Sequence, residues 1–347
     1  RGTGVSPGVL RELQPPSAWL DSWPLAAAVC ALAALLLVAL VVRRRRWRLL
    51  LAPAVLATVL AAATVANALS AYVPTPQALR FLVTGHVGGS GGVVETVSIG
   101  APALHVPAST TYVYLPPGYR PGAHRYPVAY LLHGSPGRST DWFAAGDAAH
   151  TLDVLIRHHL VPPMLVVAPD TNGGGLRDTE CLDDPHGGPQ VETYLRSVVV
   201  PYVDAHFSTD PRPAARIIGG MSAGGFCALD QGLRHRDTYG PVLAIEPYGD
   251  PGAAWARRLT PAQFAAVSPS HYLPTIALPA PVPVFLDIGA TAAAADQADT
   301  DHVEAELRAR GGPVLRRDEA GQGHTWNTAR IALPYGLVFA ARFLPPA

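Results

Sequence analysis

The stretch "GGMSAGGFCAL", residues 219–229, places one serine between glycines, after an apolar run and before a helix-like segment. Its centre, residues 220–224, matches Gly-x-Ser-x-Gly. A serine on a sharp strand-to-helix turn has a strained backbone, and side chains two residues before and after it would collide with the turn. The pattern therefore predicts an exposed nucleophile at Ser222, with the Ala223 N–H as an oxyanion donor. The alternative is a glycine-rich turn that holds a serine by chance.

Short apolar runs alternate with longer amphipathic segments from residue 108 onward. Several of the runs are apolar at consecutive positions, as in strands that helices cover on both faces. This alternation predicts an α/β fold with a largely parallel sheet. The runs are "TTYVYLP", "YPVAYLLHG", "MLVVAPD", "ARIIGGMS", "PVLAIEP", "PVFLDIGA" and "PVLRRDEA", and the expected helices cover residues 145–158, 191–206, 224–235, 300–310 and 327–343.

A serine hydroxyl at neutral pH needs a base to remove its proton. The sequence "GQGHTW", residues 321–326, offers His324 in a glycine-flanked loop that follows the last β-type run. Thirteen histidines are present, and any one of them is more often structural or solvent-facing than catalytic. The loop and the chain order favour His324 as the base.

A second oxyanion donor is expected in the loop after an early strand. The sequence "LLHGSPG", residues 131–137, ends such a strand, and the backbone N–H of Ser135 is the candidate donor. We expect His133 to fix this loop rather than carry a proton. The alternative is an ordinary Pro/Gly turn.

Five segments together resemble the esterase-D-type branch of the α/β hydrolases. They are "VYLPPGY", "YPVAYLLHGSPG", "LVVAPD", "GGMSAGGFCAL" and "GQGHTW", in this order and spacing. That branch includes esterases, feruloyl esterases and secreted mycolyltransferases. The resemblance implies an α/β-hydrolase fold over residues 108–347, with Ser222 as nucleophile, His324 as base, and the backbone of Ser135 and Ala223 as oxyanion hole.

The carboxylate that should orient the histidine is less clear. The family usually carries it a few residues after the strand at 283–289, but here that loop reads "GATAAAADQADTD". Asp296 is its first carboxylate and is the predicted third member of the triad. Asp299 and Asp301 compete, although capping of the next helix explains them more easily. Glu246 and Asp250 form an outside option, because an acid can also enter from the neighbouring strand end.

Two uncharged stretches, residues 24–42 and 49–71, are each long enough to cross a bilayer. The arginine-rich run 43–48 between them predicts a cytoplasmic loop, which places both chain ends outside. The alternative is a secretory signal that begins at Arg43 and ends in "ANALSA". The chain begins at Arg1 rather than Met, so we expect a preceding N-terminal piece.

Four regions follow from these boundaries. Residues 1–23 form a short extracytoplasmic tail, 24–72 the transmembrane hairpin, 73–107 a linker and edge region, and 108–347 the catalytic domain. Because that domain would lie in an oxidising compartment, we predict a disulfide between its two cysteines, Cys181 and Cys227. Two buried free thiols are the alternative.

Composition limits the possible partners. Acidic and basic residues are equal in number, 26 of each, and the one basic run lies between apolar stretches, so nucleic acid is not expected. No His/Cys motif for a metal occurs, and no cofactor is predicted. The oligomeric state stays open.

We predict a membrane-anchored esterase or acyltransferase for envelope lipids or glycolipids. The alternatives are an aminoacyl-phospholipid hydrolase and a degenerate binding module.

Overall fold

The protein has a mixed sheet at its centre. The computed structural model describes residues 5–14, 19–85, 91–175 and 177–346. Within them, eight strands pair in the order β1-β2-β4-β3-β5-β6-β7-β8. The strands are β1 (Val93–Ala101), β2 (Val106–Leu115), β3 (Val128–Leu132), β4 (Leu165–Ala168), β5 (Arg216–Met221), β6 (Val242–Ile245), β7 (Val284–Gly289) and β8 (Val314–Glu319).

Strand direction follows the predicted pattern. From β4 to β8 every neighbouring pair is parallel, whereas β1–β2 and β2–β4 are antiparallel. All seven predicted runs form strands, and β1 is added at the edge. The expected largely parallel α/β fold is confirmed. Parallel strands end at the same edge of a sheet, so the segments that follow β3, β5, β6 and β8 meet there.

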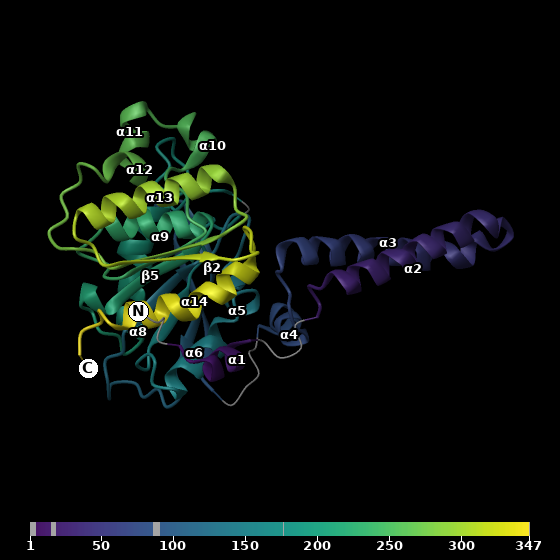
Figure 1. The fold of residues 1–347 in the computed structure, drawn as a ribbon, viewed down its shortest axis with the longest axis horizontal. Helices are drawn as coiled ribbons and strands as arrows, with labels where there is room; N and C mark the ends of the chain where they lie inside the picture. The colour runs from purple at the N-terminus through teal and green to yellow at the C-terminus, as the bar shows by residue number, and fades with distance from the viewer. Residues whose placement is uncertain (1–4, 15–18, 86–90, 176, 347) are drawn as a thin grey trace.

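Helices cover both faces of the sheet, as Figure 1 shows for α9 and α13 on one side and α6 and α14 on the other. Side chains of β3 alternate between the two buried clusters, with Tyr130 in one and Leu131 in the other. The helices are α5 (Asp141–Ala144), α6 (Ala148–Arg157), α7 (Val191–Tyr194), α8 (Val200–His206), α9 (Ala223–Arg234), α10 (Gly252–Ala256), α11 (Pro261–Ala266), α12 (Pro269–Tyr272), α13 (Ala294–Ala309) and α14 (Trp326–Ala341).

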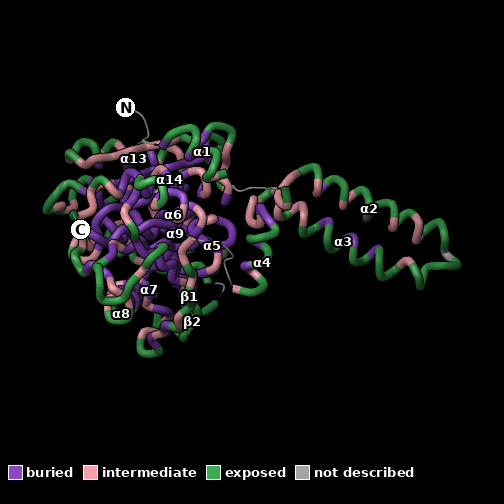
Figure 2. The backbone as a smooth tube through the Cα atoms, turned by 90° about the horizontal axis from the view of Figure 1, so that it is seen from below, coloured by how far each residue is buried: buried purple, intermediate pink, exposed green. Residues whose placement is uncertain are grey.

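Two long apolar helices, α2 (Trp23–Val42) and α3 (Trp47–Ser70), form a hairpin that projects from the domain (Figure 1). Their mean hydropathy is 3.0 and 2.3. Only 11% and 17% of these apolar windows are buried, so the hairpin is exposed over most of its length (Figure 2). Alanines that include Ala33, Ala57 and Ala61 pack between the two helices. The arginine run lies at the turn of the hairpin.

The region 73–107 is more ordered than a tether. It contains α4 (Pro76–Thr84), whose Phe81 is 2% exposed and belongs to a domain core cluster, and the edge strand β1. The short helix α1 (Pro7–Leu13), which precedes the hairpin, packs on α6 through Val9. Both ends of the hairpin therefore meet at the same domain.

Candidate active site

Ser222 occupies the turn between β5 and α9. Its backbone has φ 59° and ψ −123°, a left-handed conformation that a serine adopts only under constraint. A Cβ on Gly220 would lie 2.1 Å from the carbonyl oxygen of Gly224. A Cβ on Gly224 would lie 2.2 Å from the carbonyl oxygen of Leu132, at the end of β3. The first glycine is required by the turn itself, as the sequence indicated, and the second by the approach of the neighbouring strand.

His324 lies within hydrogen-bond distance of this serine. It is in the loop between β8 and α14, and its Nε2 is 2.8 Å from the Ser222 Oγ. The Ser222 hydroxyl can donate to Nε2 only if the neutral ring carries its proton on Nδ1. The structure thus brings together the two side chains that the sequence named as nucleophile and base.

The carboxylate beside His324 is Glu246, which directly follows β6. Its Oε2 lies 3.4 Å from His324 Nδ1, and its side chain has no exposed area. Oε1 accepts a hydrogen bond from the Gly289 N–H at 2.8 Å. Oε2 accepts no hydrogen bond from any described residue, so it is available to the Nδ1 proton. A buried carboxylate without a partner costs free energy, and His324 provides such a partner for Glu246.

The assignment of Asp296 to this position is therefore corrected. Asp296 lies in the first turn of α13, where no ion pair with His324 forms. Burial raises the pKa of the Asp296 carboxyl, while the nearby His324 lowers it. The acid comes from the end of β6 because β7 stops at a glycine, which leaves room for Glu246 to reach past it. The sequence did indicate this possibility, because Glu246 follows the neighbouring strand and forms part of the outside option.

The other acids have different partners. Asp299 accepts the Gly249 N–H at 2.9 Å, and Asp250 accepts the Gly252 N–H at 2.7 Å. Asp301 pairs with Arg316. Because α13 begins at Ala294, Asp299 and Asp301 lie inside the helix and do not cap it, contrary to the sequence-based interpretation.

The loop after β3 lies against the nucleophile. A Cβ on Gly134 would be 3.2 Å from the Ser222 Cβ, so the backbone of Ser135 follows immediately beside the serine. His133 is 1% exposed, with Nδ1 2.8 Å from the Gly134 carbonyl oxygen and Nε2 accepting the Thr171 N–H at 3.0 Å. Both nitrogens are thus engaged in holding the loop. Ala223 begins α9, so its N–H has no acceptor within the helix.

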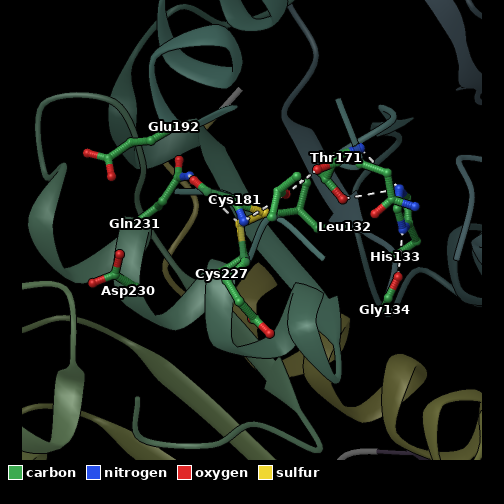
Figure 3. Close-up of a disulfide and its surroundings, with 12 residues drawn as sticks. Leu132, His133, Gly134, Thr171, Cys181, Glu192, Cys227, Asp230 and Gln231 are labelled. Carbon is green, nitrogen blue, oxygen red and sulfur yellow. Dashed lines mark hydrogen bonds between the residues drawn. A yellow bond between two sulfur atoms is a disulfide. The ribbon is translucent and has the colours of Figure 1, made fainter. Parts of the chain in front are cut away.

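A disulfide joins Cys181 to Cys227, with Cα atoms 5.6 Å apart (Figure 3), as predicted. Cys227 lies in α9, five residues after the nucleophile. The Gln231 side chain of the same helix donates to the Cys181 carbonyl oxygen at 3.1 Å. The loop that follows β4 is thereby attached to the nucleophile helix at two points. Cys30, in α2, is free.

Acidic groups gather around Tyr248, two residues after Glu246. The Tyr248 hydroxyl donates to Glu180 at 2.6 Å, and its ring stacks on Phe226 of α9, with ring centroids 5.4 Å apart. Burial, followed by the charge of Asp178, holds the pKa of Glu180 well above its usual range. Asp178 and Thr179, the two residues before Glu180, help to line a cavity of about 480 Å³. It is lined by Arg177, Asp178, Thr179, Asp184, Pro189, Ala254, Trp255 and Arg258.

Metal coordination does not appear among these groups. No cluster of three or more His, Cys, Asp or Glu side chains within the described ranges has the geometry to hold a metal ion.

The fold and the Ser–His–Glu arrangement define an α/β hydrolase with a serine nucleophile elbow. The family model described as "Putative esterase" matches residues 108–325, and the chain belongs to this esterase family. An esterase of Mycobacterium tuberculosis is 29% identical over 143 residues, which cover 41% of this chain and 29% of the relative. The chain spans only 29% to 34% of the length of its mycobacterial and corynebacterial relatives.

Solved structures agree on the fold. A ferulic acid esterase superposes with a TM-score of 0.62 at 24% identity, covering 73% of this chain and 99% of its own. An S-formylglutathione hydrolase from Agrobacterium tumefaciens also gives a TM-score of 0.62, at 18% identity, covering 75% of this chain and 98% of its own. At these identities the likeness establishes the α/β-hydrolase fold alone.

Proposed function

We propose that this protein hydrolyses or transfers carboxylic-ester acyl groups through an acyl-enzyme on Ser222. The observation that carries the proposal is the chain of contacts from Ser222 Oγ to His324 Nε2 at 2.8 Å and from His324 Nδ1 to Glu246 Oε2 at 3.4 Å. Nucleophile, base and orienting acid in this geometry are the parts of a serine triad.

The reaction begins when His324 Nε2 takes the Ser222 proton and Oγ attacks the ester carbonyl. The negative charge on the carbonyl oxygen is stabilised by the backbone N–H groups of Ser135 and Ala223. Glu246 balances the positive charge that His324 then carries. The intermediate collapses, His324 gives the proton to the departing alkoxide, and an alcohol leaves. Water, or an acceptor hydroxyl, repeats the sequence in reverse and frees Ser222.

We further propose that α2 and α3 anchor this site to a membrane. Their lengths of 20 and 24 residues, their hydropathy and their low burial support a pair of spanning helices. Trp19 and Trp23, 48% and 56% exposed, lie at the end of the hairpin nearest the domain, where tryptophan suits a membrane–water interface. The arginine run at the opposite end favours the cytoplasm, which would place the domain outside.

The substrate we favour is an ester of an envelope lipid or glycolipid. A domain held next to a bilayer meets lipid esters at high effective concentration. The family relationship supports an ester. Close packing of the serine, histidine and glutamate argues against a binding module that has lost catalysis, because such a module has no need of the triad geometry.

An aminoacyl-phospholipid is the second candidate, and one observation favours it. Two carboxylates other than the buried Glu180 lie near Tyr248: Asp178 and Asp296 act on it electrostatically, and Asp296 also acts on His324. An ammonium group on the acyl part of a substrate would find opposite charge there.

A fluorophosphonate probe and a lipid extract test the proposal together. The full chain in detergent should be labelled by the probe, and Ser222→Ala should not be labelled while its melting temperature stays near that of the wild type. Loss of the nucleophile should lower turnover on the order of a million-fold. Mass spectrometry of an envelope lipid extract should show which ester species the wild type alone consumes. Equal ester hydrolysis by Ser222→Ala would refute the mechanism.

Topology has its own test. In a Cys30→Ser background, a cysteine introduced at exposed Arg257 should react with an impermeant maleimide in whole cells, and one at Arg45 should react only after lysis. The reverse pattern would contradict the proposed orientation.

A further inference from the structure

The two ends of the apolar hairpin close on each other next to the catalytic domain. The Asn67 side chain of α3 donates to the carbonyl oxygens of Leu20 and Val73, each at 2.9 Å, and accepts the Val73 N–H at 2.7 Å. The N–H of Trp19 donates to the Pro74 carbonyl oxygen at 3.1 Å. These bonds join the segment before α2 to the segment after α3. We call residues 19–21 and 71–74 the junction.

The junction is hydrogen-bonded to α14, the helix that follows the loop of His324. Arg330, one turn into α14, donates through Nη1 to the carbonyl oxygens of Ala71 and Ala145 at 2.7 and 2.8 Å. Its Nη2 lies 3.1 Å from Asp21, and the Arg330 side chain is only 7% exposed. Trp326, the first residue of α14 and two residues after His324, contacts the Tyr72 ring edge-on, with centroids 6.4 Å apart.

The same junction is connected to the loop that contains Ser135 through Asp141, the first residue of α5. The Tyr72 hydroxyl donates to Asp141 Oδ1 at 2.6 Å, and Asp141 is 1% exposed. Asp141 Oδ2 accepts the Arg138 N–H at 2.8 Å, and a Cβ on Gly137 would come within 2.8 Å of Oδ2. The carboxylate therefore lies directly under the loop that contains Ser135. Burial, then the charge of Asp141, raises the pKa of Tyr72, so it keeps its proton as donor.

Trp142 contacts both the strand end that precedes the oxyanion loop and the first residue of α14. Its Nε1 donates to the carbonyl oxygen of Leu132 at 2.8 Å, one residue before His133. Its ring meets that of Trp326 edge-on, with centroids 5.3 Å apart. The oxyanion loop, the histidine loop and the junction thus form one packed unit. Catalysis requires the reacting groups to be placed within about an ångström. The two loops that place them are supported by residues next to the hairpin.

We propose that the junction is a positioning element of the active site, with Tyr72 as its principal positioning residue. Tyr72 holds Asp141 under the oxyanion loop, and Arg330 ties Ala71 and Asp21 to α14. The hairpin therefore does more than retain the enzyme at a surface, because the geometry around Ser222 depends on it. This inference rests on the proposed ester-cleaving function.

Tyr72→Phe in the full chain, purified in detergent, tests the proposal. The variant keeps the aromatic contact with Trp326 and removes only the hydrogen bond to Asp141. With a short-chain nitrophenyl ester, we expect kcat to fall roughly tenfold with KM within twofold, since transition-state placement is lost and substrate contacts are kept. The rate of fluorophosphonate labelling should fall in parallel.

Tyr119→Phe is the matched control. It also removes one hydroxyl, which accepts the Ser208 N–H at 2.9 Å, in a part of the domain that does not contact the catalytic loops. We expect Tyr119→Phe to lower the melting temperature slightly and to leave kcat and the labelling rate unchanged. A Tyr72→Phe enzyme with wild-type kcat and labelling rate would overturn the proposal and leave Tyr72 with a structural role only.

Asp21→Asn provides a second variant in case Tyr72→Phe does not fold. It removes the charge opposite Arg330 without changing the shape of the side chain, and we expect kcat to fall roughly threefold. Wild-type kcat in this variant would likewise count against the junction. Failure of the proposed function gives a different result: the wild type itself would not be labelled by fluorophosphonate, or Ser222→Ala would be labelled equally.

Discussion

Glu246 reaches His324 across the end of the strand that separates them. Glu246 follows β6, His324 follows β8, and β7 lies between in the sheet order. The contact is possible because β7 ends in Gly289, whose N–H binds Oε1 at 2.8 Å. A side chain at Gly289 would come within 2.9 Å of that oxygen. The carboxylate that pairs with His324 thus comes from a neighbouring strand end rather than from the loop after β7.

Substitution of Glu246 and of Asp296 should show which of these two carboxylates orients His324. We expect Glu246→Gln to lower kcat by about 10³ to 10⁴, because the amide neither favours the Nδ1–H tautomer nor balances the imidazolium charge. Asp296→Asn should retain kcat within a fewfold of the wild type. Steady-state kinetics on a nitrophenyl ester measures both. A slow Asp296→Asn enzyme beside a fast Glu246→Gln enzyme would return the role to Asp296.

Gly289→Ala should damage the site without replacing any member of the proposed triad. Its Cβ would lie 2.6 Å from the Gln322 carbonyl oxygen, in the histidine loop, and 2.9 Å from Glu246 Oε1. Overpacking of this kind costs about 1–3 kcal/mol of stability. We also expect a clear loss of kcat, because both Glu246 and the histidine loop must move. Gly175→Ala, where no atom lies within 4 Å, is the control and should leave kcat and the melting temperature unchanged.

Removal of the disulfide should destabilise the domain by about 2–4 kcal/mol, since the bond closes a loop between residues 46 positions apart. Cys181→Ser and Cys227→Ser should each lower the denaturant midpoint, and a reducing agent should lower the midpoint of the wild type but not that of either variant. Cys30→Ser is the control, because that cysteine is free. An unchanged midpoint after reduction would show that the loop is held by its other contacts.

Acid should weaken one buried ion pair between helices. The pKa of Glu192 is lowered to about 2: burial would raise it, but the hydrogen bonds from His235 and Arg234 outweigh burial. A carboxylate with a lowered native pKa adds stability above its unfolded pKa and loses it as pH falls through the native value. The contribution, at most about 3 kcal/mol, should therefore disappear between roughly pH 4.5 and 2.

Chemical denaturation at a series of pH values measures this dependence. Glu192→Gln should be less stable than the wild type at neutral pH, and the difference should shrink toward pH 2. A more exposed pair, Arg157 with Glu12, whose side chains are 60% and 45% exposed, provides the comparison, and Glu12→Gln should change stability little at any pH. Parallel curves for wild type and Glu192→Gln would contradict the assignment.

The sequence by itself determined the features that local chemistry imposes. Gly220 is required by the turn on which Ser222 sits, and the apolar runs have the pattern of central strands covered on both faces. His324 could be named because it follows the last strand in a glycine-flanked loop. The pairing of Cys181 with Cys227 followed from number and compartment, since only two cysteines were available to it.

Only the tertiary structure decided which groups from distant segments meet. Five carboxylates near two strand ends were candidates, with Asp296 preferred, and the contact of Glu246 with His324 depends on the open end of β7, which no local pattern records. The contact of Tyr72 with Asp141 joins residues 69 positions apart. Its energy comes from burial and a hydrogen bond that form only on folding, so the sequence placed Tyr72 at the end of the predicted transmembrane hairpin and gave no sign of its contact with the catalytic domain.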